Sequence, residues 1–407
     1  MPHDTDIVIA GGGIAGCVLA LALEQSGFSV TICDSTPAER RAAPDFDGRA
    51  YAIAPDCRRM LAVLGLWPAL EADAQPIEAM RICTAERDVP PGPVALGFDA
   101  AEGSGPLAFM IEDHHLRRTA LSALAERGTI RHLDPVAVSE HRPGPGSVLV
   151  RLDDGRELRA ALLIACDGRH SRIAHAAGIA RVERDYRQTG LVAALEHERP
   201  HEGVARQFFL PAGPLALLPL RGNRSSIVWA ERPELADLIH ALPERDYLDE
   251  IARRTGDALG VSRLIGKRWR YPLILTLAQR YHAPRLALVG DAAHGIHPLA
   301  GQGLNLGLRD VAAMAEVLSR AGRRGEDIGA TDVLERYQQW RRFDATLLGL
   351  GCDALERGFS ESGPLVRAAM DFGMRAVGRI GPLRRLLADI ATGQDEDAPL
   401  LLQGRAI

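Results

Sequence analysis

The stretch Ile7-Val8-Ile9-Ala10-Gly11-Gly12-Gly13-Ile14-Ala15-Gly16 decides the fold of this 407-residue chain. Its first four residues form an apolar run that is typical of a buried strand, and the residues after Ile14 are rich in Ala and Leu, as in a helix. Gly11, Gly13 and Gly16 therefore lie between a strand and a helix with the G-x-G-x-x-G spacing. In that motif the glycines allow, in turn, a tight bend, close backbone approach to a pyrophosphate, and close packing of helix on strand.

The residues around this turn predict a dinucleotide site. A pyrophosphate would lie at the helix N-terminus, where free N–H groups and the helix dipole favour negative charge. A second strand-like segment, residues 29–33, ends at Asp34, about 20 residues downstream, where a carboxylate can bind ribose hydroxyls. Residues 7–23 carry no charge, as in a signal peptide or a membrane-spanning helix. However, three glycines interrupt this segment and no basic n-region precedes it, so we expect neither. The predicted dinucleotide-binding residues here are Gly11, Gly13, Ile14, Ala15, Gly16 and Asp34.

The composition is typical of a soluble enzyme of the cytoplasm. The chain has 48 Lys and Arg against 53 Asp and Glu, and its net charge of −5 offers no general attraction to nucleic acid. Its length is sufficient for two domains with substantial cores. The six cysteines show neither a C-x-x-C pair nor a zinc-binding spacing, which fits a reducing compartment. We therefore expect no bound metal.

A second glycine-rich stretch lies far along the chain. The apolar run 286–289 leads into Gly290-Asp291, and the loop Pro298-Leu299-Ala300-Gly301-Gln302-Gly303 precedes a helix-forming segment. A carboxylate at a strand end can accept hydrogen bonds from ribitol or ribose hydroxyls. If the pyrimidine end of a flavin lay beyond the loop, the helix N-terminus would stabilise negative charge on the reduced ring. Between the two glycine-rich stretches, another strand-like run ends in Asp167-Gly168, with Ser171 placed to cap the next helix.

These three motifs, in this order, resemble the fingerprints of the single-component (class A) FAD-dependent aromatic hydroxylases. The resemblance covers nearly the whole chain. Within that family the chain is similar to the branch that hydroxylates the ring of ubiquinone precursors. The matches to the branch are Gly48-Arg49-Ala50-Tyr51-Ala52-Ile53, Tyr186-Arg187-Gln188-Thr189-Gly190-Leu191-Val192, Gly213-Pro214-Leu215-Ala216-Leu217-Leu218-Pro219-Leu220 and Tyr271-Pro272-Leu273.

The resemblance implies a cofactor and the residues that bind it. The cofactor would be FAD, and NAD(P)H would be a transient co-substrate, in keeping with the absence of a second G-x-G-x-x-G unit. Arg49 and Arg117 would contact FAD, Asp167 and Gly168 would lie near the pyrophosphate, and Asp291 would bind the ribitol. The remaining residues expected near the flavin are Gly290, Pro298, Gly301, Gln302, Gly303, Leu304 and Asn305. Asp34 stands where the family usually has the longer glutamate, so ribose binding there could pass through a water.

The implied reaction begins with reduction of FAD by NAD(P)H and addition of O₂ at the flavin C4a. The terminal oxygen of the hydroperoxide then passes to the ring of a polyprenylated phenol. A small soluble aromatic acid is an alternative substrate, and a flavin-binding subunit without turnover is an alternative function. The candidate catalytic residues are His297, as a base toward the phenol, and Pro298; a structural role for His297 is the alternative. His114 and His115 are not expected to bind metal, because adjacent residues on a helix diverge.

The predicted fold is α/β, with a Rossmann-like FAD-binding domain interleaved with a mostly antiparallel β-sheet substrate domain and followed by a helical C-terminal region. The FAD-binding domain would comprise residues 1–72, 106–180 and 279–340, the substrate domain residues 73–105 and 181–278, and the helical region residues 341–407. The apolar run 215–220 suits a prenyl pocket and a core strand equally. The basic amphipathic stretch 365–390 could lie on a membrane surface or pack on protein, so peripheral contact with the inner membrane or with a biosynthetic complex is an alternative to a purely cytoplasmic location.

Overall fold

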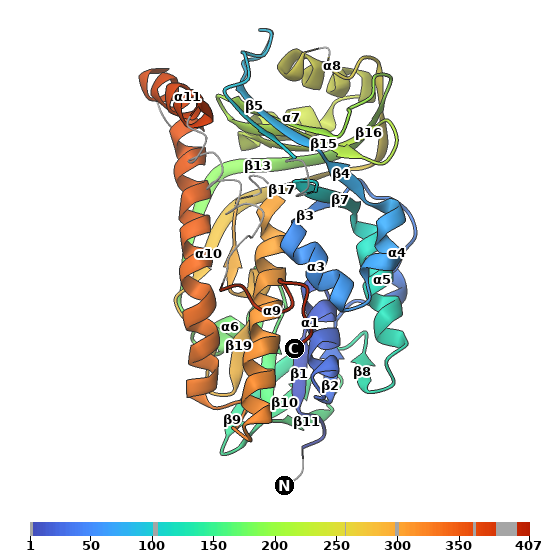
Figure 1. Cartoon of the computed structure of the whole chain (residues 1–407), viewed down its shortest axis with the longest axis vertical. Coiled ribbons are helices and arrows are strands. Elements are labelled where there is room, and N and C mark those ends of the chain that lie inside the picture. Colours follow the sequence, from blue (N-terminus) through green and yellow to red (C-terminus); the bar gives the residue numbers. More distant parts are fainter. Residues whose placement is uncertain (1–2, 101–104, 257, 298–300, 361–363, 380–396) are drawn as a thin grey trace.

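The computed structural model of the chain describes residues 3–100, 105–256, 258–297, 301–360, 364–379 and 397–407 (Figure 1). A six-stranded sheet in the order β18-β19-β12-β1-β2-β8 forms the lower part of the molecule. β1 pairs in parallel with β2 and with β12. All three strands are buried along their whole length, as parallel strands covered on both faces are. The strands are β1 (Ile7–Ala10), β2 (Val30–Cys33), β8 (Ile130–Leu133), β12 (Leu162–Ala165), β18 (His282–Ala283) and β19 (Leu286–Leu288).

Helices cover one side of this sheet, and a small antiparallel sheet lies beyond the other. α1 (Ile14–Gln25) starts directly after the glycine turn and contacts both α5 (Asp113–Ala125) and α9 (Gln302–Arg323). The 30-residue α10 (Thr331–Ser360) runs beside α9 along one flank of the molecule (Figure 1). The small sheet contacts β12 through β10, and its strands are β9 (Val138–Gly144), β10 (Ser147–Leu152) and β11 (Glu157–Ala160).

An eight-stranded sheet forms the upper part of the molecule, in the order β20-β17-β13-β16-β15-β14-β5-β6. All of its pairings are antiparallel except that between β14 and β5, so the predicted mostly antiparallel sheet is confirmed. Helices α7 (Pro233–Ala241) and α8 (Glu244–Thr255) lie on its outer face. Its strands are β5 (Ala79–Thr84), β6 (Leu96–Asp99), β13 (Arg181–His197), β14 (Val204–Leu210), β15 (Gly213–Leu220), β16 (Arg224–Glu231), β17 (Ser262–Ala278) and β20 (His294–Gly295).

Short elements connect the two large sheets. β7 (Ala108–Glu112) pairs with β3 (Ala50–Ile53) and with β4 (Gln75–Ile77) in a small sheet between them. The Ser171 hydroxyl accepts a hydrogen bond from the N–H of Ala174 at 3.0 Å, which confirms the predicted cap of α6 (Arg172–Ala176). The remaining described helices are α2 (Ala38–Arg41), α3 (Pro55–Val63), α4 (Trp67–Leu70), η1 (Glu71–Asp73), η2 (Gly290–Ala292) and α11 (Pro364–Arg379).

The C-terminal helices confirm a helical C-terminal region. α11 covers the first part of the basic amphipathic stretch, and residues 380–390 of that stretch lie outside the described residues. The rings of Phe359 on α10 and Phe209 on β14 stack with centroids 4.2 Å apart, and Met370 and Met374 of α11 pack against this cluster. Among the described residues, none of the helices combines the length and the apolarity that crossing a bilayer requires.

Candidate functional site

A cavity of about 950 Å³ lies where the glycine-rich segments meet the inner face of the eight-stranded sheet, a volume suited to a large ligand. Three glycine motifs that are far apart in the sequence contribute to its wall. The predicted residues that line it are Gly13, Ile14, Ala15, Gly16, Arg49, Arg117, Gly168, Gly290, Asp291, Gly301, Gln302, Gly303, Leu304 and Asn305. Gly11, Asp34, Asp167 and His297 are not part of this wall, and Pro298 lies outside the described residues.

The three glycines of the first motif have different surroundings. Gly11 has a left-handed φ of +107°, and a Cβ there would lie 2.3 Å from the carbonyl oxygen of Cys166. A Cβ on Gly16 would lie 1.9 Å from the carbonyl oxygen of Gly11. A Cβ on Gly13 would meet no described atom within 4 Å. Gly11 and Gly16 are therefore required by packing, whereas Gly13 leaves open space at the N-terminus of α1, where an anionic group fits.

Two arginines of the cavity wall share one buried carboxylate. Asp113, at the start of α5, accepts a hydrogen bond from Arg117 Nε at 2.7 Å and forms an ion pair with Arg49 Nη2 at 3.2 Å. Arg49 also pairs with Asp47 at 2.6 Å, and its guanidinium lies 5.0 Å from the centroid of the Trp269 ring. Because the arginine side chains are anchored in this way, two positive charges are held at the cavity beside the N-terminus of α1.

Asp34 holds the glycine turn itself. Its carboxylate accepts hydrogen bonds from the N–H groups of Gly12 and Thr36, both at 2.7 Å. Arg41 lies 3.7 Å from this carboxylate and donates to the carbonyl oxygens of Gly12 and Thr36. The sequence did not point to Arg41, because an arginine within a charged run carries no distinct signal. Ribose binding by Asp34 stays a prediction.

The turn that carries Gly290 and Asp291 rests on a buried charged pair. Asp310 on α9 accepts hydrogen bonds from the N–H of Gly290 at 3.0 Å and from Arg341 Nε at 2.9 Å. The same carboxylate lies 2.5 Å from His294 Nε2. Burial acts to raise the pKa of Asp310, but His294 and Arg341 outweigh it and hold the pKa below its usual value. This arrangement fixes the start of η2, from which Asp291 reaches the cavity.

Burial in the cavity wall raises the pKa of the Asp291 carboxyl, and Arg169, 3.8 Å away, opposes that shift. Asn305 has an internal structural role as well as a place in the wall. Its carboxamide accepts from the N–H of Ala54 at 2.8 Å and donates to the carbonyl oxygen of Ala52 at 2.7 Å, which ties α9 to β3. One oxygen of Asp167 is buried without a hydrogen-bond partner among the described residues, which leaves it available to a ligand group that reaches it.

The structure gives His297 a packing position. Its side chain is buried, with Nε2 3.3 Å from Gln188 Oε1 and its ring edge-on to Tyr186 at 5.0 Å. Burial lowers the pKa of His297 to about 4, so the imidazole is neutral at pH 7. The side chain is not among the described residues of the cavity wall, and its Nδ1 is buried without a hydrogen-bond partner among them, so a role for His297 as a base stays a prediction.

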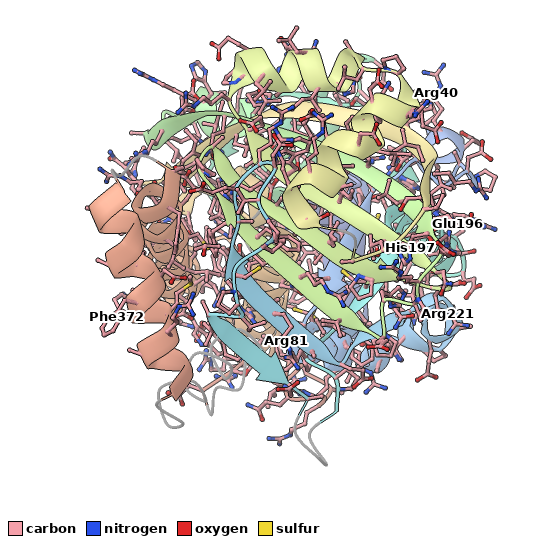
Figure 2. All side chains as sticks on the ribbon, turned by 90° about the horizontal axis from the view of Figure 1, so that it is seen from above. Arg40, Arg81, Glu196, His197, Arg221 and Phe372 are labelled. Carbon is pink, nitrogen blue, oxygen red and sulfur yellow. The ribbon has the colours of Figure 1, made fainter. Side chains whose placement is uncertain are left out.

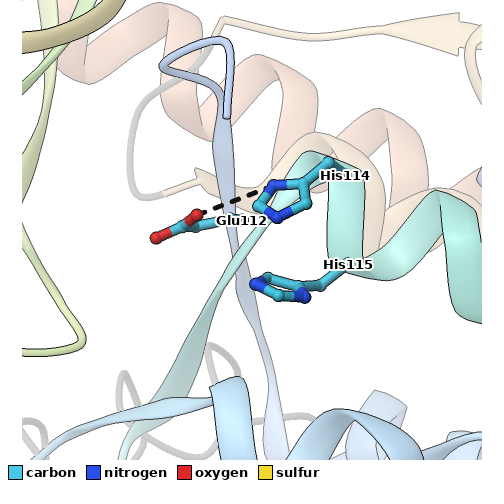
Figure 3. A group of neighbouring side chains, drawn as sticks. All are labelled: Glu112, His114 and His115. Carbon is cyan, nitrogen blue, oxygen red and sulfur yellow. Dashed lines mark ion pairs between the residues drawn. The ribbon is translucent and has the colours of Figure 1, made fainter. Parts of the chain in front are cut away.

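The side chains of His114 and His115 lie close together (Figure 3). The prediction that they diverge because they are adjacent on a helix is therefore wrong. Both lie in the first turn of α5, and their ring centroids are 3.9 Å apart. Together with Glu112 they offer one ligand atom each within 4.8 Å of one another. However, Glu112 also pairs with Arg224 at 2.8 Å, and His115 with Asp73 at 3.1 Å. The arginine charge opposes a cation at this position, so we assign no metal to it.

The cavity wall becomes largely apolar away from the glycine motifs, although Arg206 and Gln207 of β14 also line it. Alternate residues of β15 divide between two environments: Ala216 and Leu218 line the cavity, whereas Leu215 and Leu217 belong to the buried core beneath α7 and α8. One face of the run 215–220 is therefore a core face and the other lines the cavity, and its role as a prenyl pocket stays a prediction. Further apolar side chains at this end come from β5, β6 and α10, and they include Met80, Ile82, Leu96, Phe98 and Leu355.

Comparisons with known proteins agree with this geometry. The model of the FAD-binding domain family matches residues 4–347. The chain is 43% identical to the ubiquinone hydroxylase UbiL of Rhodospirillum rubrum, over 98% of this chain and 92% of the relative. It is 35% identical to the 3-demethoxyubiquinol 3-hydroxylase of Escherichia coli, over 96% and 98% of the two chains. The crystal structure of p-nitrophenol 4-monooxygenase PnpA from Pseudomonas putida superposes with a TM-score of 0.78 at 20% identity, covering 98% and 100% of the two chains, which shows a shared fold.

Proposed function

The chain belongs to the FAD-binding domain family, together with the ubiquinone hydroxylases, and from this membership we propose that it hydroxylates the aromatic ring of a polyprenylated phenol in ubiquinone biosynthesis. It is an FAD-dependent monooxygenase, with FAD as its cofactor and NAD(P)H as its co-substrate. One oxygen atom of O₂ enters the ring, the other leaves as water, and NAD(P)H supplies the two electrons.

A single observation supports this substrate class best. One continuous cavity joins a polar half, lined by glycine backbone and arginines, to an apolar half on the inner face of the eight-stranded sheet. A cofactor with a pyrophosphate suits the first half, and a hydrocarbon tail attached to a ring suits the second. A small aromatic acid carries a carboxylate and would leave most of the apolar surface uncovered.

Named residues fit the parts of FAD. Gly13 at the N-terminus of α1, with Arg49 and Arg117, would hold the pyrophosphate. Asp291 would bind the ribitol hydroxyls, and the segment from Gly301 to Asn305 would lie against the isoalloxazine. When bound, FAD supplies the chemistry that accepts electrons from NAD(P)H and activates O₂. The protein orients the ring and excludes water with its apolar floor.

The decisive experiment uses the FAD-loaded chain, NADH or NADPH, ¹⁸O₂ and a phenol carrying two isoprene units. We expect oxygen uptake that the phenol stimulates, and a product that contains one ¹⁸O atom by mass spectrometry. The same assay with 4-hydroxybenzoate tests the alternative of a soluble substrate. If only 4-hydroxybenzoate stimulated oxygen uptake, the substrate would be a soluble aromatic acid instead of a prenylated phenol. Stable FAD binding without turnover of either compound would favour a flavin-binding subunit.

A substrate with an isoprenoid tail resides in the membrane, and we infer that the exposed face of α11 contacts the membrane surface. The helix packs on β6 and α10 through residues such as Met370 and Met374. Phe372 instead points away from the molecule (Figure 2), with 73% of its surface exposed, and Val366 is also exposed. The same helix carries Arg375, which pairs with Asp371 at 2.7 Å, and exposed apolar and basic residues on one helix are the combination that binds lipid surfaces.

A further inference from the structure

One row of residues crosses the inner face of the eight-stranded sheet, with one member from each strand between β17 and β6. Every member lies opposite the next in the strand register, and every member lines the cavity. In order from β17, the row is Trp269, Val192, Val228, Ala216, Gln207, Ile82 and Leu96. The Trp269 end adjoins Arg49, which belongs to the polar half of the cavity. The Leu96 end belongs to the apolar half.

Strand alternation directs the Gln207 side chain into the cavity. Its neighbours on β14, Arg206 and Phe208, pair with Leu217 and Leu215. Phe208 and both leucines belong to the buried core on the side of α7 and α8. Figure 2 shows the sheet from that side, with Arg81, the partner of Arg206 on β5, labelled. Because successive side chains point to opposite faces, Gln207 faces the inner side with its row partners Ala216 and Ile82.

Gln207 is the one carboxamide in a row whose other side chains are hydrocarbon or indole. Its amide makes no hydrogen bond or ion pair with any residue in the part of the chain that the structure describes. Gln188 on β13 is different, because its amide donates to the carbonyl oxygen of Ala212 and to Glu356, both at 2.7 Å. The amide of Gln188 is therefore hydrogen-bonded within the protein, whereas the amide of Gln207 is free to bind a ligand.

This freedom determines which part of a prenylated phenol can lie beside Gln207. Covering an amide with hydrocarbon leaves its donor and acceptor unpaired, which costs free energy. The polar atoms of such a substrate are the oxygens on its ring. A ring oxygen beside Gln207 satisfies the amide, whereas an isoprenoid segment in the same place leaves it unpaired.

We propose that Gln207 hydrogen-bonds a ring oxygen of the substrate and thereby sets which ring carbon faces the flavin. The proposal rests on the proposed function and names the specificity-determining residue of the same site. Ile82 and Leu96, the row members beyond Gln207, then contact the start of the isoprenoid tail. Leu355 on α10, which also lines the cavity, is partly exposed and continues the apolar wall toward the surface.

The test compares two probes on the FAD-loaded full chain. One is a phenol carrying two isoprene units, and the other is the same compound without its ring hydroxyl. Binding is followed by the absorbance change of the bound flavin. We expect Gln207→Leu to weaken binding of the phenol by about 10-fold, the effect of one lost hydrogen bond, and not to weaken binding of the deoxy compound. The conservative variant Gln207→Glu keeps an acceptor for the hydroxyl and should retain the preference for the phenol.

Controls separate the possible failures. Gln339→Leu makes the same change at an exposed position on α10 and should leave both affinities as in the wild type. FAD content and Tm show that Gln207→Leu is folded, which is expected because the amide has no hydrogen-bond partner among the described residues. Equal weakening of both probes, or of neither, would overturn the role of Gln207 while leaving the proposed function intact. A wild-type protein that binds neither probe would overturn the proposed function and this assignment together. A change in the hydroxylated ring position with Gln207→Leu would add direct support.

Discussion

The carboxylate of Asp113 accepts a hydrogen bond from Arg117 Nε at 2.7 Å, one helical turn further along α5. Asp113 is almost fully buried, whereas Arg117 lies on the wall of the cavity. The same carboxylate pairs with Arg49, which comes from a different segment of the chain. One buried acid therefore orients two cationic side chains toward the place where the pyrophosphate of FAD would lie.

Replacing Asp113 should weaken FAD binding although the side chain does not line the cavity. Asp113→Asn removes the charge that holds Arg49 and Arg117, and hydrogen bonds to charged groups contribute about 1.5–3 kcal/mol. We therefore expect the Kd of the apoprotein for FAD to rise about 10- to 100-fold, measured by quenching of flavin fluorescence. Glu140→Gln removes an exposed acid from the ion pairs of Arg142 and Arg151 and serves as control. Equal affinities in the two variants would contradict the anchoring role.

Gly13 and Gly16 should respond differently to the same substitution. Gly13→Val places its side chain in the open space at the N-terminus of α1, so we expect a folded protein that purifies without FAD. Gly16→Val drives a Cβ into the carbonyl of Gly11 and should lower stability regardless of cofactor. Flavin absorbance and thermal unfolding of the apoproteins distinguish the two effects. A yellow Gly13→Val protein would refute our placement of the pyrophosphate.

Asp291 should contribute to FAD affinity through the ribitol hydroxyls. Asp291→Ala leaves those hydroxyls without an acceptor, at a cost of about 1–3 kcal/mol. The corresponding increase in Kd can be measured by isothermal titration of the apoprotein with FAD. Asp154→Ala, which removes an exposed acid paired with Arg156, is the matched control. A normal affinity in Asp291→Ala would move the ribitol site elsewhere in the cavity.

Stability should depend on pH through His297. Burial lowers the pKa of this histidine to about 4, below its value of about 6.5 in an unfolded chain. The unfolded state therefore binds more protons between these values, so stability is lost as the pH falls through this window. Between pH 7 and pH 5 the loss from this residue is about 2 kcal/mol. Urea unfolding of His297→Gln at both pH values should show a smaller difference than the wild type, whereas His175→Gln, at an exposed position, should not.

Membrane contact through α11 should depend on Phe372. Phe372→Ser removes an exposed apolar side chain, so the fraction of protein that sediments with vesicles containing anionic lipid should fall. Leu238→Ser on α7 changes a residue of similar exposure, 67%, on a different surface and is the control. Unchanged sedimentation of Phe372→Ser would indicate that α11 only packs on β6 and α10.

Local patterns in the sequence determined the elements and the cofactor class. The strand, glycine turn and helix at residues 7–25 could be predicted because the turn needs glycine where a Cβ would strike backbone, as Gly11 and Gly16 show. Arg117 was anticipated from resemblance to the family. Asp113 was not, although its position four residues earlier on a helix is a recognisable signal.

Only the tertiary structure decided which distant residues share the cavity. Asp310 supports the Gly290 turn from a different helix, and Arg41 supports Asp34, because folding brings their segments together. Gln207 belongs to a cavity-lining row because strands between residues 79 and 278 pair in one register. A shift of one residue would turn its amide to the opposite face of the sheet. That register depends on hydrogen bonds between strands far apart in the chain, and no local pattern records them.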